Sequence, residues 1–478
     1  MRRLVPVLVA VLTVTALAAP TALAQSDDGN GGEPTLGDAG GGKPKRTDDY
    51  RSTLKDAIAD IQAYWTEEFP RLYRADYTPI PRSRVFAAAP GAKLPRCGGD
   101  RITYDDIRGN AAYISGCPGK PFVIYDDAER LPQIHRDFGG LAVPLVFAHE
   151  WGHVVQDQAG TIDGRVIVRE LQADCFAGSW MRRVAAGDSA RVRLKSGNLD
   201  SALAAMLSLA DPVGISEGTD QDAHGSGFDR TTAFQQGFDD GAPACVPYIE
   251  TPPPIVEIPF TSAREASNGG NLPADEVIPA SVDLLNDFYT QVEPAYTPKT
   301  IDDIYSFDSS KANDLPKCGG TKQDAATVKN RVFYCIDDGD FGFEEKYLQH
   351  IYDDIGDFGV TTLLANPFAT YVETIQQFPG VNDNADNAVL GADCYTGGFA
   401  AAMFNGALLV DPSTGDPKYE LSPGDLDETI QAFIDYSAAR GVSKDLDVTF
   451  ARLRAFRDGF LNGYSTCSGY ASATASFG

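Results

Sequence analysis

Apolar residues recur at helical spacing in three stretches of the first half of the chain. The first stretch begins near Thr47, which is a favourable residue for opening a helix. Its apolar positions form one stripe: Leu54, Ile58, Ile61 and Trp65. Residues 140–158 and 166–186 predict two further helices, since neither has proline after Pro144.

Residues 111–125 have a different pattern. "AAYISGCPGKPFVIY" is made of short β-branched and aromatic runs around a Pro-Gly-containing turn, which predicts strands. The expected fold class is α+β: an α-rich domain with a small antiparallel sheet.

The chain then repeats this pattern. "ADCFAG" at 173–178 matches "ADCYTG" at 392–397. Likewise, "FDRTTAFQQGFDDGAPAC" at 228–245 matches "FARLRAFRDGFLNGYSTC" at 450–467. Two further segments match in the same order, one of them containing "LPRCGG" and "LPKCGG". We therefore expect a tandem duplication, with domains at 48–247 and 279–478. The Pro-rich stretch between them, 248–278, predicts an extended linker.

The first residues predict export. Residues 1–24 combine Arg2 and Arg3, an apolar run and an Ala-x-Ala site, as in a secretory signal peptide. Residues 25–47 are rich in Gly and Asp and predict a disordered linker. The expected location is secreted and extracellular, with association with the cell envelope left open. No later segment is apolar for long enough to span a bilayer, so we expect no stable membrane insertion after cleavage.

The net charge of −27 bears only on which binding partners to expect. It argues against nucleic acid as a partner and does not specify a substrate. The expected partners are a protein or peptide substrate and, within the chain, the second repeat.

Eight cysteines follow the repeat, four in each copy. In an exported chain this predicts disulfides. Four cysteines allow three pairings in each copy, and nearly equal loop lengths between the copies favour one of them. The predicted bridges are Cys97–Cys117, Cys175–Cys245, Cys318–Cys335 and Cys394–Cys467.

"FAHEWGHVVQ" at 147–156 carries the candidate chemistry. His149 and His153 are four residues apart, so both imidazoles project from one face of the predicted helix. This HExxH arrangement can bind zinc. Glu150 can then act as the general base that takes a proton from a zinc-activated water.

A third ligand decides between the classes that use HExxH. Gln156 and Ala159 stand where a metzincin needs glycine and histidine, so that class is excluded. A gluzincin needs glutamate on the next helix and aspartate one turn later, and "RELQADCFAG" supplies Glu170 and Asp174. We expect Glu170 as the third ligand and Asp174 as a hydrogen-bond acceptor for a ligand histidine.

These motifs, with "HGSGFDRTTAFQQGFDDGAPAC", resemble the bacterial neutral zinc metallopeptidase family over roughly residues 48–247. The resemblance implies a gluzincin-like fold, peptide-bond hydrolysis, His149, His153 and Glu170 as ligands and Glu150 as base. It supplies no substrate. His224 precedes the last helix of the first copy and is a candidate for stabilising the oxyanion.

The second copy lacks these groups. Asn366, Pro367 and Thr370 align with the HExxH residues, and Val389 aligns with Glu170. We therefore expect one zinc per chain and a catalytically inactive second repeat. The predicted function is a secreted zinc endopeptidase. The alternative is a non-catalytic extracellular binding protein on the same scaffold, and the intact Glu150 favours the peptidase.

Overall fold

The computed structural model describes residues 47–162, 164–194, 198–215, 223–383, 385–439 and 448–472. The predicted signal peptide and nearly all of the predicted linker at 25–47 lie outside these ranges. The chain forms two compact units. Unit 1 comprises the chain up to Leu194 together with Ala233–Pro253, and unit 2 comprises Lys195–Thr232 together with Pro254–Gly478. These units differ over residues 195–232 from the predicted domains 48–247 and 279–478, which stay a prediction from the sequence repeat.

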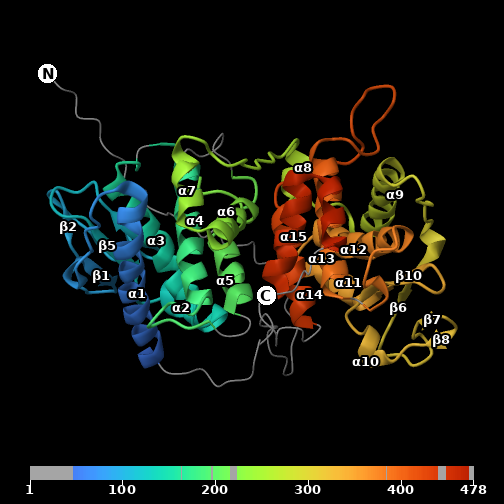
Figure 1. Ribbon diagram of the computed structural model, residues 1–478, viewed down its shortest axis with the longest axis horizontal. Helices are drawn as coiled ribbons and strands as arrows, with labels where there is room; N and C mark the ends of the chain where they lie inside the picture. The colour runs from blue at the N-terminus through green and yellow to red at the C-terminus, as the bar shows by residue number, and fades with distance from the viewer. Residues whose placement is uncertain are drawn as a thin grey trace, which may run out of the picture. The chain divides into compact units, whose positions relative to one another are not determined.

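Unit 1 is a group of helices beside a small sheet (Figure 1). Its elements are α1 (Thr47–Tyr73), β1 (Val85–Ala88), β2 (Arg96–Cys97), β3 (Asp100–Arg101), β4 (Ala111–Ile114), β5 (Phe122–Asp126), α2 (Arg130–Phe138), α3 (Ala142–Ala159), α4 (Val166–Ala185) and α7 (Ala242–Cys245), with short 3-10 turns at Arg82–Arg84 and Val246–Ile249. Helix α6 (Gly227–Asp240) begins in unit 2 and ends in unit 1. The predicted helices and strands of this region are therefore present.

Unit 2 has a similar content. Its elements are α5 (Asn198–Leu207), α8 (Ala263–Ser267), α9 (Ala274–Val292), β6 (Ile304–Phe307), β7 (Lys317–Cys318), β8 (Thr321–Lys322), α10 (Ala325–Val328), β9 (Val332–Cys335), β10 (Asp340–Glu344), α11 (Glu345–Asp354), α12 (Asp357–Ile375), α13 (Asp386–Phe404), α14 (Asp425–Ala439) and α15 (Val448–Asn462), with 3-10 turns at Ile301–Asp303, Val381–Asp383 and Tyr464–Ala471.

The α+β fold class is confirmed. The two-stranded sheets β2-β3 and β7-β8 are antiparallel as expected, but the two three-stranded sheets are mixed. In unit 1 the strand order is β1-β5-β4, with β1 parallel to β5 and β4 antiparallel to it. In unit 2 the order is β6-β10-β9, with β6 parallel and β9 antiparallel to β10. The long connection between β1 and β5 allows these two strands to pair in parallel. The sequence pattern alone does not show whether they run parallel or antiparallel.

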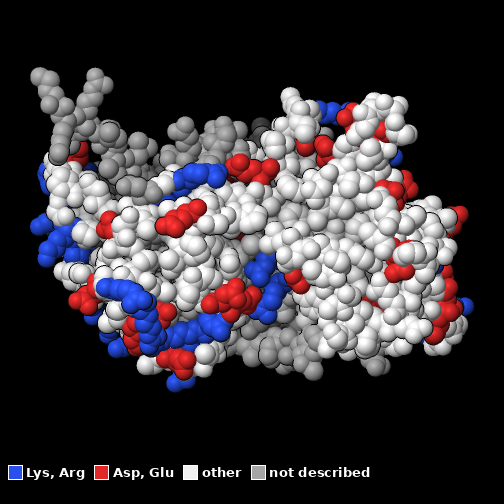
Figure 2. All heavy atoms as spheres, turned by 45° about the horizontal axis from the view of Figure 1, so that its top comes forward, with Lys and Arg blue, Asp and Glu red and all other residues white. Residues whose placement is uncertain are grey.

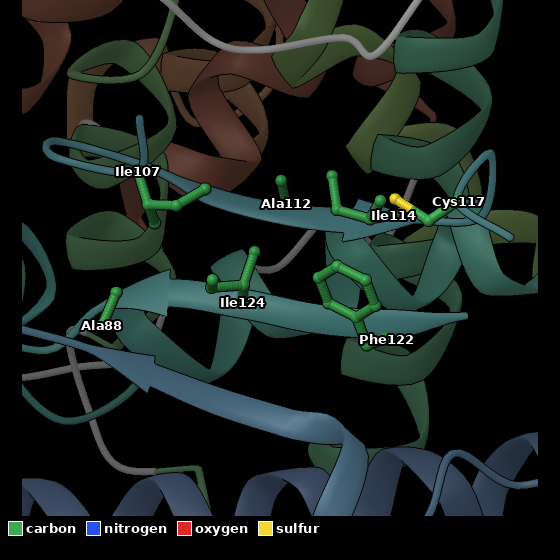
Figure 3. Packing of buried hydrophobic residues seen from close by; sticks show 7 residues of the cluster. All are labelled: Ala88, Ile107, Ala112, Ile114, Cys117, Phe122 and Ile124. Atoms are coloured by element: carbon green, nitrogen blue, oxygen red, sulfur yellow. The ribbon is translucent and has the colours of Figure 1, made fainter. Parts of the chain in front are cut away.

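The central strand β5 is covered on both faces, as its five buried residues require. On one face Ala112 and Ile114 of β4 lie opposite Ile124 and Phe122. This face carries an apolar cluster (Figure 3) of Ala88, Ile107, Ala112, Ile114, Cys117, Phe122 and Ile124. On the other face Tyr125 packs edge-on against Phe147 of α3, with ring centroids 5.1 Å apart. The sheet therefore supports the helix that carries HExxH.

Two pairs of glycines allow unusually close helix crossings. In unit 1 a Cβ on Gly178 of α4 would lie 2.0 Å from the Phe234 carbonyl oxygen, and one on Gly237 of α6 would lie 1.8 Å from the Cys175 carbonyl oxygen. In unit 2 the corresponding distances are both 1.9 Å, from Gly397 to Phe456 and from Gly459 to Cys394. Each crossing thus brings backbone against backbone, which only glycine permits.

Four disulfides connect Cys97 with Cys117, Cys175 with Cys245, Cys318 with Cys335 and Cys394 with Cys467. These are the pairs expected from the sequence, and each lies within one unit.

Among the described residues, no helix combines the length and the apolar character needed to cross a bilayer. Most of the chain's excess of acidic residues lies after residue 254. On the face seen in Figure 2 the Lys and Arg side chains are gathered in a few patches.

Candidate metal centre

Helices α3 and α4 bring the three predicted ligands together. His149 and His153 lie one turn apart on α3, and their ring centroids are 4.9 Å apart. Glu170 of α4 faces both rings: its Oε2 lies 3.1 Å from His149 Nε2 and its Oε1 lies 3.4 Å from His153 Nε2. One donor atom from each residue falls within 4.8 Å of the other two.

A glycine sets the spacing of these helices. Gly152 lies on α3 between the two histidines, and Ala173 lies on α4 between Glu170 and Asp174. A Cβ on Gly152 would meet the Ala173 Cα at 2.6 Å and its Cβ at 2.8 Å. The missing side chain therefore lets the two helices approach until the carboxylates of α4 reach the imidazoles of α3.

The far nitrogen of each imidazole has its own acceptor. His149 Nδ1 lies 2.6 Å from Asp174 Oδ1, and His153 Nδ1 lies 2.9 Å from Gln156 Oε1. Gln156 is itself held, because its amide group donates to the Arg169 carbonyl and to Gln172. With protons on both Nδ1 atoms, each Nε2 keeps a lone pair, and both Nε2 atoms lie beside the Glu170 carboxylate. This orientation fixes the tautomer that a metal ligand requires.

The sequence predicts Asp174 in this position but misses Gln156. The only available signal for Gln156 is its spacing, since it stands three residues after His153 on the same helix.

Glu150 is held from the sheet. It is 3 % exposed, and its Oε2 accepts a 2.8 Å hydrogen bond from the backbone N–H of Tyr113 on β4. Tyr113 is tied to the same helix a second time, because its hydroxyl donates to Asp157. Burial raises the pKa of Glu150 above that of an ordinary glutamate. The charges of His149 and His153 act on Glu150, so this carboxylate lies near both histidines.

The charges of the site suit a dication. Burial opposes a charged imidazolium at His149, but the carboxylates of Asp174 and Glu170 outweigh it and raise the His149 pKa to about 10. Burial likewise opposes a charged Glu170, yet the two histidines lower its pKa well below the usual value. The site thus favours positive charge between the Nε2 atoms and Glu170. Two imidazoles and one carboxylate are a donor set that zinc accepts while keeping a position for water.

Comparison with known proteins agrees with this geometry. Residues 116–247 match the family described as "Putative neutral zinc metallopeptidase". The predicted family resemblance is confirmed over this segment. Zinc is the cation that the family implies, and the donor set fits it.

Two relatives of this chain come from Escherichia coli. The "Uncharacterized protein YpfJ" of strain K12 is 36 % identical over 128 residues, which covers 22 % of this chain and 42 % of the relative. The protein of the same name from strain O6:H1 gives the same values. This chain therefore spans less than half the length of the relatives that it matches. No solved structure matches.

His224 belongs to unit 2, whereas the three clustered residues belong to unit 1. Its Nδ1 lies 3.2 Å from Asp211 Oδ1, and its backbone N–H also donates to that carboxylate. These contacts fix the ring within unit 2. Its predicted role at the oxyanion stays a prediction.

The aligned residues of unit 2 have different partners. Asn366 of α12 donates a 2.9 Å hydrogen bond to Asp393 of α13, the position that aligns with Asp174. Arg452 of α15 binds both oxygens of Asp393, each at 2.8 Å. Its guanidinium lies 4.4 Å from the Phe433 ring centroid. A buried arginine thus supplies positive charge at this carboxylate of unit 2.

Proposed function

We propose that the chain is an exported zinc-dependent peptidase, with His149, His153 and Glu170 as metal ligands and Glu150 as the general base. One observation carries the proposal. Both Nδ1 atoms have a buried or part-buried acceptor, which leaves both Nε2 atoms available beside the Glu170 carboxylate. A purely structural cluster would not need the buried Glu150 beside it.

Zinc supplies a Lewis acid that polarises a peptide carbonyl and lowers the pKa of a water molecule. Glu150 accepts a proton from the attacking water at Oε1, while the Tyr113 N–H holds Oε2 in place. As the carbon–oxygen bond forms and the carbon–nitrogen bond breaks, Glu150 returns the proton to the leaving amine.

The location and the second repeat are part of the same proposal. Four disulfides support an oxidising compartment, and hence export. The equal order and direction of strands in the two sheets support a tandem duplication. Arg452 at Asp393 supports loss of the metal from the second copy, because it places a fixed cation where a zinc site would need an acceptor for histidine. We therefore expect one zinc per chain, which metal analysis of the purified protein measures.

The decisive experiment compares Glu150→Gln with Glu170→Ala. Glu150→Gln keeps all three ligands, so it should retain zinc and lose peptide hydrolysis by several orders of magnitude. Glu170→Ala removes a ligand and should lose both. Glu129→Gln is the matched control, because Glu129 forms an exposed ion pair with Arg108 on the same unit.

Each outcome separates the alternatives. A parent protein that binds zinc but cleaves no member of a peptide library would favour the non-catalytic binding protein. Hydrolysis by Glu150→Gln at the rate of the parent would show that Glu150 is not the base.

A further inference from the structure

Unit 2 contains three buried carboxylates that the proposed peptidase does not use. Asp357 opens α12, and Asp425 and Glu428 lie one turn apart at the start of α14. One oxygen from each falls within 4.8 Å of the other two. The three residues are only 8, 5 and 7 % exposed. Like charges this close in a buried setting repel strongly, so the cluster needs a compensating charge.

Each carboxylate uses one oxygen to accept backbone hydrogen bonds. Asp357 Oδ2 accepts from Leu272 at 2.9 Å, and Asp425 Oδ2 accepts from Ser422 at 2.8 Å. Glu428 Oε2 accepts from Phe358 at 2.9 Å and from Gly359 at 3.3 Å. These bonds orient the three groups without neutralising them.

The remaining oxygen of Asp357 gives an independent indication of a ligand. Asp357 Oδ1 is inaccessible to solvent and has no hydrogen-bond partner among the described residues. A buried, unpartnered carboxylate oxygen is costly, and native proteins keep such atoms when an ion or water satisfies them.

The backbone also makes room for the cluster. A Cβ on Gly356, which has φ +145°, would lie 2.2 Å from Glu428 Oε1 and 2.3 Å from its Oε2. The chain therefore passes close to the Glu428 carboxylate at a position that glycine alone can occupy.

We propose that Asp357, Asp425 and Glu428 bind one Ca²⁺ ion, at a site separate from the zinc site. All the ligand atoms that these three side chains offer are oxygens, which a hard cation prefers and zinc does not. Ca²⁺–oxygen distances of roughly 2.3–2.6 Å allow ligand oxygens up to ~5 Å apart across the ion, whereas Mg²⁺ allows only ~4.2 Å and holds its water tightly. Mg²⁺ usually keeps several of its water ligands, whereas Ca²⁺ is held mainly by protein oxygens. The burial of the three carboxylates therefore favours Ca²⁺.

Shared protons are the competing way to reduce the charge. Burial, followed by the neighbouring Asp357 carboxylate, raises the pKa of Glu428 to about 8. A cluster that holds protons alone would respond to pH and not to Ca²⁺.

The test uses the full exported chain, freed of other metals and loaded with one equivalent of zinc. CaCl₂ or MgCl₂ is titrated at constant ionic strength, while bound Ca²⁺ and the unfolding temperature are measured. The parent should bind one tight equivalent of Ca²⁺, and its unfolding temperature should rise with the logarithm of the Ca²⁺ concentration. Mg²⁺ at equal concentration should give little rise.

Asp425→Asn should lose the tight equivalent and the Ca²⁺-dependent rise. Without Ca²⁺ it should unfold at the temperature of the parent or above it, because one like charge is gone and the amide oxygen can still accept from Ser422. Glu428→Gln is the second variant, should Asp425→Asn not fold. Glu420→Gln, an exposed acid five residues before Asp425, is the matched control and should behave as the parent.

Two results would overturn the proposal. One is a parent that binds no tight Ca²⁺ at millimolar concentration, which would leave shared protons as the compensating charge. The other is Asp425→Asn binding as much Ca²⁺ as the parent, which would place the ion elsewhere on this acidic chain.

Discussion

Asp174→Asn tests how the site prepares a histidine for metal binding. The Asp174 carboxylate lies 2.6 Å from His149 Nδ1 and keeps the proton there. Asparagine has nearly the same shape but no charge, and its amide group can donate to Nδ1 instead. That would move the imidazole proton to Nε2 and remove the lone pair that faces Glu170.

The size of the effect follows from the bond that is lost. Hydrogen bonds to charged groups contribute about 1.5–3 kcal/mol. Loss of a carboxylate that orients a metal ligand costs roughly 10–100-fold in metal affinity, which is ~1.4–2.7 kcal/mol. Both routes give a zinc dissociation constant one to two orders of magnitude larger in Asp174→Asn.

Competition with a chromophoric zinc chelator measures this constant. Asp60→Asn is the control, because Asp60 is also buried in unit 1 but bonds Trp180 and Ser189 rather than a histidine. Zinc binding by Asp174→Asn within twofold of the parent, in a protein that unfolds at the same temperature, would refute the proposed role of the carboxylate.

Two further predictions concern helix spacing and pH. Gly152→Ala places a Cβ 2.6 Å from Ala173 Cα, so it should weaken zinc binding and destabilise the fold by about 1–3 kcal/mol. Gly140→Ala is the control, because a Cβ at Gly140 meets no atom within 4 Å. Equal zinc affinity in the two variants would contradict the role of Gly152. Burial raises the pKa of Asp229 from 3.8 to about 7. A raised acid pKa contributes stability that is present below pH ~4 and lost as the pH rises through 7. Asp229→Asn should therefore gain stability over the parent as the pH rises, from ~1.6 kcal/mol at pH 5 to ~4 kcal/mol at pH 8. Urea unfolding at the two pH values measures this change, and a difference that does not change with pH would contradict the shift.

Local spacing predicts much of the metal centre. His149 and His153 share a helix face because they are four residues apart, and Glu170 and Asp174 do so for the same reason. The sequence cannot give the distance between the two helices, since it depends on Gly152 meeting Ala173 across a tertiary contact. It also cannot give the hydrogen bond from Tyr113 to Glu150, because that bond depends on how the sheet packs against α3.

The same limit applies to the fold of both units. The helices and strands follow from apolar periodicity, whereas the parallel pairing of β1 with β5 does not. The carboxylate cluster of unit 2 is a stronger example: Asp357 and Asp425 are far apart along the chain and lie in no recognisable motif. Only the packing of α12 against α14 brings them together.

The reciprocal glycine crossings have a consequence for genetics. At Gly237 the obstacle to any side chain is the Cys175 backbone carbonyl, and at Gly178 it is that of Phe234. Trimming a neighbouring side chain can relieve an ordinary steric conflict, so second-site suppressors are common in packed cores. No amino-acid substitution can trim a carbonyl oxygen. Revertants of a Gly237 mutant should therefore restore glycine at that codon, and intragenic suppressors elsewhere should be absent.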